Sequence, residues 1–252
     1  MTSLPDNHDA APRDGANGSP AEGGAEIVPH LFEENGEDGR LLMRCQMVEG
    51  KLHGLLERYA DDGAPVMKAN YLNGVLHGSM QAYAEDGQLV QETDYLHGVA
   101  HGTMKIHVNG RCISVQSMAG GVPSGLAQTY DEAGLLTARM HYVKGAIEGP
   151  AEFFHENARV RKSHYKAGLL EGESIDFDRQ GKIVQTCVYQ ANVLHGPMRR
   201  YWPDGTLMEE TTYRHGVPTA EPVRYDSKGR RSDLAASTPD LLDRLQKLVR
   251  GS

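Results

Sequence analysis

The 252-residue sequence has little of what a membrane protein or a disulfide-stapled secreted domain needs. No apolar run approaches the ~20 residues that cross a bilayer. The N-terminus lacks the basic and then apolar layout of a secretory signal. Three cysteines, Cys45, Cys112 and Cys187, lie far apart without C-x-x-C spacing, which favours small buried apolar residues over bridges or ligands. These absences predict a cytoplasmic location.

Basic charge is also scarce. The formal net charge is −8, and residues 1–26 hold half of it, with five acidic residues against Arg13 alone. The remaining chain is therefore only mildly acidic and shows no basic stripe of the kind that neutralises phosphates. We expect no nucleic-acid partner. Residues 1–26 contain no aromatic residue and are predicted to be a disordered acidic tail.

Recognisable catalytic motifs are missing as well. The chain has no nucleophile elbow, no phosphate-cradling glycine loop, no H-E-x-x-H and no cysteine and histidine cluster with zinc spacing. The sequence therefore predicts a protein that is not an enzyme and that has no catalytic residue, cofactor or metal.

What the chain does have is regularity. Its tyrosines fall on a lattice with a step of about twelve residues or a multiple of it, and Phe154, Phe177, His107 and Met118 fill empty slots. Such spacing indicates a repeat array. We interpret the tyrosines as a structural ladder with one aromatic rung per strand. Its members are Tyr59, Tyr71, Tyr83, Tyr95, Tyr130, Tyr142, Tyr165, Tyr189, Tyr201, Tyr213 and Tyr225.

Glycines mark the full repeat, which is twice the tyrosine step. One column begins Gly50, Gly74 and Gly98, a second lies four residues later, and a third lies about nine residues after that. Eight repeats then cover residues 48–232, and residues 27–47 form a degenerate first repeat. Stability should come from stacking of neighbouring repeats, not from one central core.

Within a repeat the pattern is two strands and two turns. Asp62-Gly63, Asn109-Gly110 and Asp204-Gly205 are read as tight hairpin turns, because glycine supplies the positive φ that such turns need. In the second strand Leu89, Thr93 and Tyr95 share parity, which predicts one common face. The first strand alternates less cleanly, which a bulge would explain. The predicted fold class is an all-β repeat: a single elongated, twisted antiparallel sheet of consecutive hairpins, with a C-terminal α-helix.

The segments Tyr71–Gly78, Tyr95–Gly102 and Asn192–Gly205 resemble MORN repeats, in particular the variant found in bacterial proteins of the YwqK antitoxin-like family. The resemblance covers nearly the whole chain outside the tail and the C-terminal segment. It implies an elongated, curved sheet used for protein or lipid contact. The antitoxin role is associated with that family and is not expressed in these residues.

Residues 233–252 differ in kind. Ser237 to Asp240 form a helix-start signature, and leucines then recur at helical spacing. An amphipathic helix is predicted from about Pro239 to Arg250, after a short linker. Two roles are open for it: a cap over the last strands, or a docking element for a partner.

Specificity should lie where the lattice breaks or where binding-prone residues gather. Histidines form a column before the second glycine, and such a ladder either packs beside the turn or holds a ligand. Trp and Arg are enriched at binding hot spots. The candidate partner-binding residues are His77, His101, His107, Met118, Arg199, Arg200 and Trp202.

Two functions follow as hypotheses. The first is a non-catalytic cytoplasmic protein-binding repeat protein, an antitoxin or immunity factor that sequesters a toxin or effector encoded by a neighbouring gene. The second is a peripheral membrane scaffold that binds acidic lipids, for which the mildly acidic body is poorly suited. An enzyme with the array as an accessory module is disfavoured, because the residues after the array are too few to fold a catalytic domain.

Overall fold

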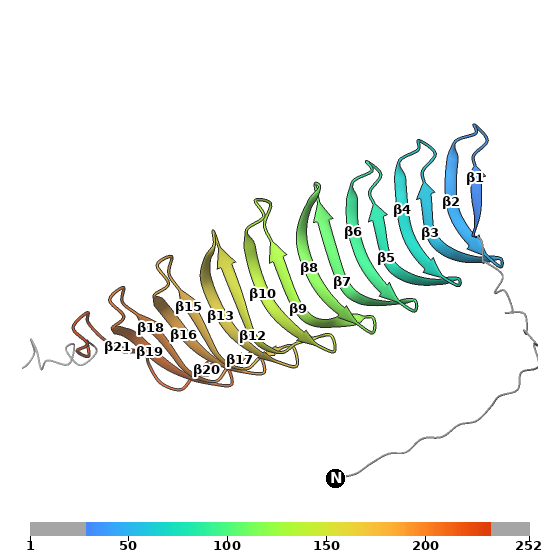
Figure 1. The fold of residues 1–252 in the computed structure, drawn as a ribbon. Helices are drawn as coiled ribbons and strands as arrows, with labels where there is room; N and C mark the ends of the chain where they lie inside the picture. Colours follow the sequence, from blue (N-terminus) through green and yellow to red (C-terminus); the bar gives the residue numbers. More distant parts are fainter. Residues whose placement is uncertain (1–28, 233–252) are drawn as a thin grey trace, which may run out of the picture.

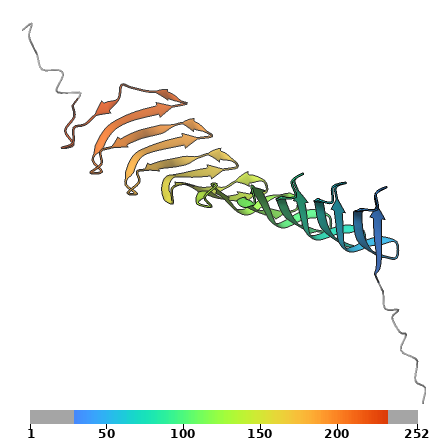
Figure 2. The ribbon, with the colours of Figure 1, turned by 90° about the horizontal axis from the view of Figure 1, so that it is seen from above.

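The computed structural model describes residues 29–232, and these residues form one antiparallel sheet. The strands lie side by side in chain order, so that β1 and β21 stand at opposite ends of a long ribbon (Figure 1). Seen from above, the ribbon turns progressively along its length, as the right-handed twist of strands requires (Figure 2). The sheet has a single layer, and no described segment covers either of its faces.

The strands in chain order are β1 His30–Asn35, β2 Leu41–Val48, β3 Lys51–Tyr59, β4 Pro65–Leu72, β5 Val75–Tyr83, β6 Leu89–Leu96, β7 Val99–Val108, β8 Arg111–Ala119, β9 Val122–Tyr130, β10 Leu136–Val143, β11 Ala146–Ile147, β12 Gly149–His155, β13 Ala158–Lys166, β14 Leu169–Leu170, β15 Gly172–Phe177, β16 Ile183–Gln190, β17 Val193–Leu194, β18 Gly196–Tyr201, β19 Leu207–Arg214, β20 Val217–Pro218 and β21 Val223–Arg224. After β10 the first strand of each repeat is divided in two: one residue at the bulge separates the parts in the first three of these repeats, and residues 219–222 separate β20 from β21. Glu148, for example, separates β11 from β12 and donates its N–H to the His141 carbonyl at 2.9 Å.

The predicted fold class is wrong in one respect. Residues 29–232 are all-β and contain no α-helix, because the described backbone is paired in strands or closed in turns and loops. The helix predicted from about Pro239 to Arg250 lies outside the residues that the structure describes, as does the tail of residues 1–26. Residues 29–232 also hold no helix with the length and hydropathy of a membrane-spanning segment.

The two kinds of turn are assigned differently from the sequence-based prediction. Two-residue turns occupy the first glycine column, where Asn73 and Gly74 both have positive φ, at 53° and 82°. That is the type I′ geometry. The loop at Asp62-Gly63 is longer: Ala60 and Ala64 close it, Gly63 alone has positive φ, and Asp62 Oδ1 accepts the Ala64 N–H at 2.9 Å. Only Asn109-Gly110 of the predicted tight turns is a two-residue turn.

Neighbouring repeats are joined at these two-residue turns by hydrogen bonds that step from one repeat to the next. The Gly74 N–H donates to the Leu52 carbonyl at 2.7 Å, and the Gly98 N–H donates to the Leu76 carbonyl at 2.8 Å. The same bond recurs down the array to Gly216 and Leu194, at 2.9 Å. The first glycine column therefore makes the tight turn and also fixes the stacking of repeats.

Bulges decide which face each aromatic side chain takes. Between β5 and β6, Tyr83 pairs with Leu89 while Ala82 pairs with Gln91, so Val90 is an extra residue. This shift puts Leu89 on the face opposite to Thr93 and Tyr95, and corrects the prediction that all three share one face. The less regular alternation of the first strand agrees with this pattern of bulges.

The predicted single tyrosine ladder is two ladders on opposite faces. Tyr71 shares its face with Ala69, whereas Tyr83 shares the other face with Gln81, to whose Oε1 its hydroxyl donates at 2.9 Å. From Tyr71 to Tyr83 the face changes because a two-residue turn pairs Tyr71 with Leu76, a residue of opposite parity. From Tyr83 to Tyr95 it changes because of the bulge at Val90.

Candidate functional site

One face of the sheet carries most of the methionines, and we call it the methionine face. Its central column follows the register from strand to strand. The members of this column are Cys45, Leu56, Ala69, Met80, Thr93, Met104, Gln116, Ala127, Met140, Ala151, Ser163, Ser174, Cys187, Met198 and Thr211. The small members are buried although only one layer is present, with Ala69 at 0% exposure. Larger side chains of the same face must therefore close over them.

A second column of the methionine face runs beside the first, toward the longer loops. It passes through Met43, Arg58, Met67, Ala82, Gln91, Ile106, Ser114, Thr129, Ala138, Phe153, Arg161, Asp176, Gln185, Arg200, Glu209 and Arg224. From Met67 to Phe153 neither column contains a charged side chain. From Arg161 onward the second column is ionic.

A third column, toward the two-residue turns, holds one of the two tyrosine ladders. Tyr71, Tyr95 and Tyr142 each pair with a glycine on the preceding strand that belongs to the second glycine column, as Tyr95 does with Gly78. A glycine is favoured there because φ is positive, and at some of these positions an added Cβ would also collide: at Gly125, opposite Tyr142, it would lie 2.9 Å from the Ser117 Cβ. The ring then covers backbone that has no side chain of its own.

The opposite face carries ion pairs on many of its strands, with uncharged breaks at Val115 and Gln128 and at Ile175 and Thr186, and we call it the charged face. Its central column alternates in sign over several strands, as in Glu33, Arg44, Glu57 and Lys68. The Lys68 ammonium lies 2.9 Å from Glu57, and this hydrogen bond holds the pKa of the Glu57 carboxyl below its usual value. Cross-strand pairs of this kind keep the face soluble without adding net charge.

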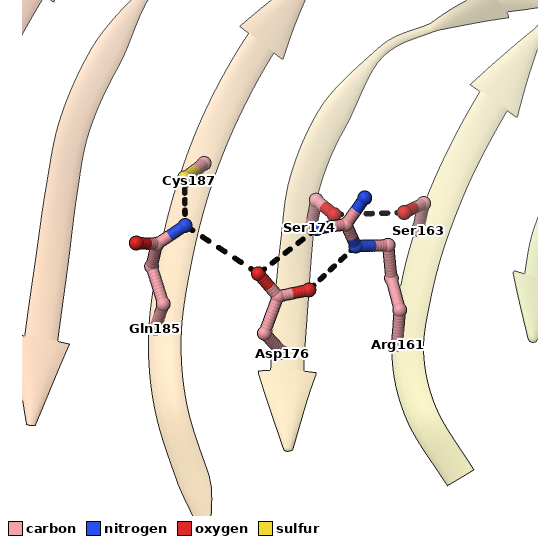
Figure 3. Close-up of polar contacts among 6 residues, drawn as sticks. All are labelled: Arg161, Ser163, Ser174, Asp176, Gln185 and Cys187. Carbon is pink, nitrogen blue, oxygen red and sulfur yellow. Dashed lines mark hydrogen bonds and ion pairs between the residues drawn. The ribbon is translucent and has the colours of Figure 1, made fainter. Parts of the chain in front are cut away.

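The ionic end of the methionine face forms a polar chain across successive strands, part of which is drawn in Figure 3. Arg161 Nε donates to Asp176 Oδ1 at 2.5 Å, and Gln185 Nε2 lies 3.4 Å from Asp176 Oδ2. Arg200 Nε donates to Gln185 Oε1 at 3.2 Å and lies near Glu209, which also accepts from Arg224 at 3.0 Å. Each polar group of this chain is thus held by its neighbours.

A hollow of about 410 Å³ opens on this part of the methionine face. Arg161, Asp176, Tyr165 and Tyr189 line its sides, and the hydroxyls of Ser163 and Ser174, 2.7 Å apart, lie among the lining residues. The hydrogen bond that Arg161 donates to Asp176 raises the pKa of the Arg161 guanidinium, and burial raises the pKa of the Tyr189 hydroxyl. Both groups therefore stay protonated at neutral pH, so the hollow offers hydrogen-bond donors beside apolar contact.

The residues predicted to bind a partner are spread over the molecule. Met118 lies in the tyrosine column of the methionine face, and Arg200 belongs to its polar chain. His107, paired with Cys112, belongs to the aromatic ladder of the charged face. Arg199 is also on that face, where its Nε donates to Glu210 at 2.5 Å.

The two other histidines and the tryptophan lie near the edges. His77 and His101 stand at the bulges beside Gly78 and Gly102, and the ring of His77 meets that of His97 at 5.1 Å. Trp202 follows β18 and donates from Nε1 to the Tyr225 carbonyl at 3.3 Å. The structure does not bring this set together, and its role in binding stays a prediction. Within residues 29–232 no three histidine, cysteine or acidic side chains gather as a metal site requires.

Comparison with known proteins gives a family for the repeat. Residues 76–97 and 194–215 match the model described as MORN repeat variant. The protein contains MORN repeats. No curated protein matches the chain. The two matched MORN segments span the turn and strands that carry Gly78, Tyr83 and Tyr95 in one repeat, and Gly196, Tyr201 and Tyr213 in the other.

Solved structures give only a faint likeness to this MORN array. The crystal structure of a mutant of S. aureus TarM in complex with Fondaparinux, alpha-GlcNAc-glycerol and UDP matches at 13% identity, with a TM-score of 0.30. That match covers 40% of this chain and 19% of the TarM chain. A second crystal structure of TarM matches at 14% identity and a TM-score of 0.28, over 44% and 19% of the two chains. The chain thus spans about a fifth of the length of these structures, and the likeness carries no argument.

Sequence reasoning named Met118 but missed the other methionines of this face, although a signal for them exists. Met80, Met104 and Met198 hold the same offset, two residues after a glycine of the second column. The predicted repeat was based on the tyrosine and glycine columns and did not include this recurrence. The division between an uncharged and an ionic half was not accessible, because it depends on bulges that set which side chains share a face.

Proposed function

We propose that this is a non-catalytic cytoplasmic protein-binding repeat protein, which holds a protein partner against its methionine face. The observation that carries the proposal is the uncharged stretch between Met67 and Phe153, where no described segment covers the side chains. The small members of this stretch are buried, but Met67, Met80, Met104 and Met140 are half-exposed and uncharged, and an uncovered surface of this kind on a soluble protein suits an interaction site. Methionine suits such a site because its flexible thioether adapts to varied shapes.

The partner we favour is a toxin or effector, which this protein would neutralise in the manner of an antitoxin or immunity factor. Support comes from the resemblance of the repeats to the YwqK antitoxin-like variant and from the length of a face that can occlude a large area of another protein.

The acidic-lipid alternative receives less support from the same surfaces. A lipid-binding face would need clustered lysines and arginines. The methionine face has no charge over its central repeats, and the charged face alternates in sign, as in the pairs of Lys68 with Glu57 and Lys105 with Glu92. We therefore retain the protein-binding proposal alone.

The test is co-expression with the product of the neighbouring gene, with growth and complex formation as readouts. Met80→Lys places a charge in the uncharged stretch and should abolish the complex and the rescue of growth. Gln81→Lys is the matched control, because Gln81 is the adjacent residue on the charged face. Both variants are checked for folding by thermal unfolding.

Three outcomes decide the proposal. Loss of binding with Met80→Lys and retention with Gln81→Lys supports it. Equal loss in both variants, or a neighbour that is an ordinary metabolic enzyme and forms no complex, would falsify it.

A further inference from the structure

The two ends of the ribbon are protected unequally. At the C-terminal end, β20 and β21 have two residues each, and Pro218 and Pro222 remove backbone donors. At the other end, β1 is a six-residue strand, and within residues 29–232 only β2 pairs with it. Natural edge strands are usually shortened, or blocked by proline or lysine, to prevent pairing with another chain. β1 contains neither residue.

The side chains of β1 are correspondingly bare. All six residues are exposed, with Leu31 at 62% and Phe32 at 49%. Leu31 has the second-highest exposure among the large hydrophobic residues described, after Val217 at 64%. The outer edge of β1 thus combines exposed backbone groups with two exposed apolar side chains.

The direction of the backbone groups on β1 follows from its loop. The Gly36 N–H donates to the Arg40 carbonyl at 2.8 Å, so Gly36 turns toward β2. Backbone groups alternate along a strand. His30, Phe32 and Glu34 therefore also turn toward β2, and Leu31 and Glu33 direct their N–H and C=O groups outward.

We propose that the free edge of β1 pairs with β1 of a second copy of this chain, antiparallel and about a two-fold axis through Phe32. This register sets Leu31 opposite Glu33 of the second copy, so that the outward groups exchange hydrogen bonds. Phe32 then lies opposite Phe32 of the second copy. His30 of each copy lies opposite Glu34 of the other, which gives two such pairs. The His30 ring and the Glu34 carboxylate form a polar pair on each side of two stacked phenylalanines.

The neighbouring registers are less favourable. A centre on Leu31 would oppose Glu33 to Pro29, which has no N–H to donate, directly beside the central pair. In the proposed register Pro29 opposes only Asn35, at the ends of the paired segment. A centre on Glu33 would oppose two Glu33 carboxylates across the axis, where like charges are destabilising.

A two-fold axis perpendicular to the sheet keeps each face continuous across the junction. His30, Phe32 and Glu34 lie on the methionine face, paired with Met47, Cys45 and Met43. The dimer would therefore present two methionine faces on the same side of one longer ribbon. This inference stands apart from the proposed function, because it concerns only the N-terminal end of the sheet.

A charge-swap series tests the register by sedimentation velocity of the full chain over a range of concentrations. Wild type should show a reversible monomer and dimer equilibrium. Glu34→Lys and His30→Glu should each weaken association about tenfold, since each makes two unfavourable cross-strand pairs. The double variant His30→Glu with Glu34→Lys restores opposite signs and should recover the affinity. A monomer at every concentration for wild type, or a double variant no better than either single one, overturns the proposal.

Cross-linking gives an independent readout. Phe32 on the axis is a non-hydrogen-bonded pair, whose Cα atoms lie about 4.5 Å apart, within the range that a disulfide spans. Because Phe32 lies opposite the native Cys45 on β2, both variants carry Cys45→Ser, and Phe32→Cys should then form a covalent dimer on mild oxidation. Val217→Cys is the control, a still more exposed position at the opposite end of the ribbon. Equal cross-linking of both variants, or none for Phe32→Cys, contradicts the pairing.

Discussion

Some glycines of the second glycine column are required for two reasons, a positive φ and a close neighbour across the strand. Gly102 has a φ of 112°, and an added Cβ would also lie 2.9 Å from the Asp94 Cβ. Gly149, in the same column, has a φ of 83° but nothing within 4 Å of the added atom. Both glycines thus have a positive φ, but they differ in the space available for an added Cβ.

We therefore expect Gly102→Ala to destabilise the protein by about 2–3 kcal/mol, from backbone strain and collision together. Gly149→Ala should cost about 1 kcal/mol, from the left-handed backbone alone. Urea unfolding of both variants measures the difference. Equal costs would show that the cross-strand collision relaxes freely.

The ion pair of Glu57 and Lys68 predicts a pH dependence. Its hydrogen bond lowers the pKa of the Glu57 carboxyl below 4.5, so its contribution to stability is present above that value and is lost as pH falls through the lowered pKa. Lys68→Met should therefore be less stable than wild type at pH 7. The difference should shrink toward pH 3. Thermal unfolding across this range checks the sign, and a difference that grows in acid would contradict it.

At the scale of strand pairs, one buried hydrogen bond joins two neighbouring strands through their side chains. Ser163 on β13 and Ser174 on β15 are both buried, at 2% and 8% exposure, and their hydroxyls are 2.7 Å apart. A lone hydroxyl left there would lose its partner and most of its access to water.

Ser163→Ala and Ser174→Ala should each cost about 1–2 kcal/mol, because each leaves one buried hydroxyl unpaired. The double variant should cost less than the sum of the two, because no unpaired group remains. A double-mutant cycle in urea gives the coupling energy. Strict additivity would indicate that water already satisfies both hydroxyls.

The elements also show what the sequence could and could not reveal. The two-strand repeat follows from the glycine and tyrosine columns, since turns need glycine and strands favour aromatic residues. The faces do not follow, because a bulge such as that at Val90 changes the side on which Leu89 lies. Periodicity counts residues, whereas a face depends on which residues are paired. For the same reason Met80 and Ala82 were not recognised as parts of one uncharged surface.

At the scale of the whole sheet, residues 29–232 have no central core, and none of their large side chains is completely buried. Each strand is supported by its neighbours, so protection should vary along the ribbon. We expect amide hydrogen exchange to be slowest in the strands from β6 to β12 and fastest in β1 and in β20 and β21, which have a partner on one side or only short pairings. Uniform protection along the sheet would indicate one cooperative unit instead.

The nearest-neighbour order of the strands has a further consequence for synthesis. The described strands pair with strands that are close in sequence, and no described strand pairs with one from a distant part of the chain. Loop closure between such near segments costs little entropy, so low contact order favours rapid folding. A nascent chain can therefore add one finished hairpin after another as it leaves the ribosome, with its newest strand as the template for the next.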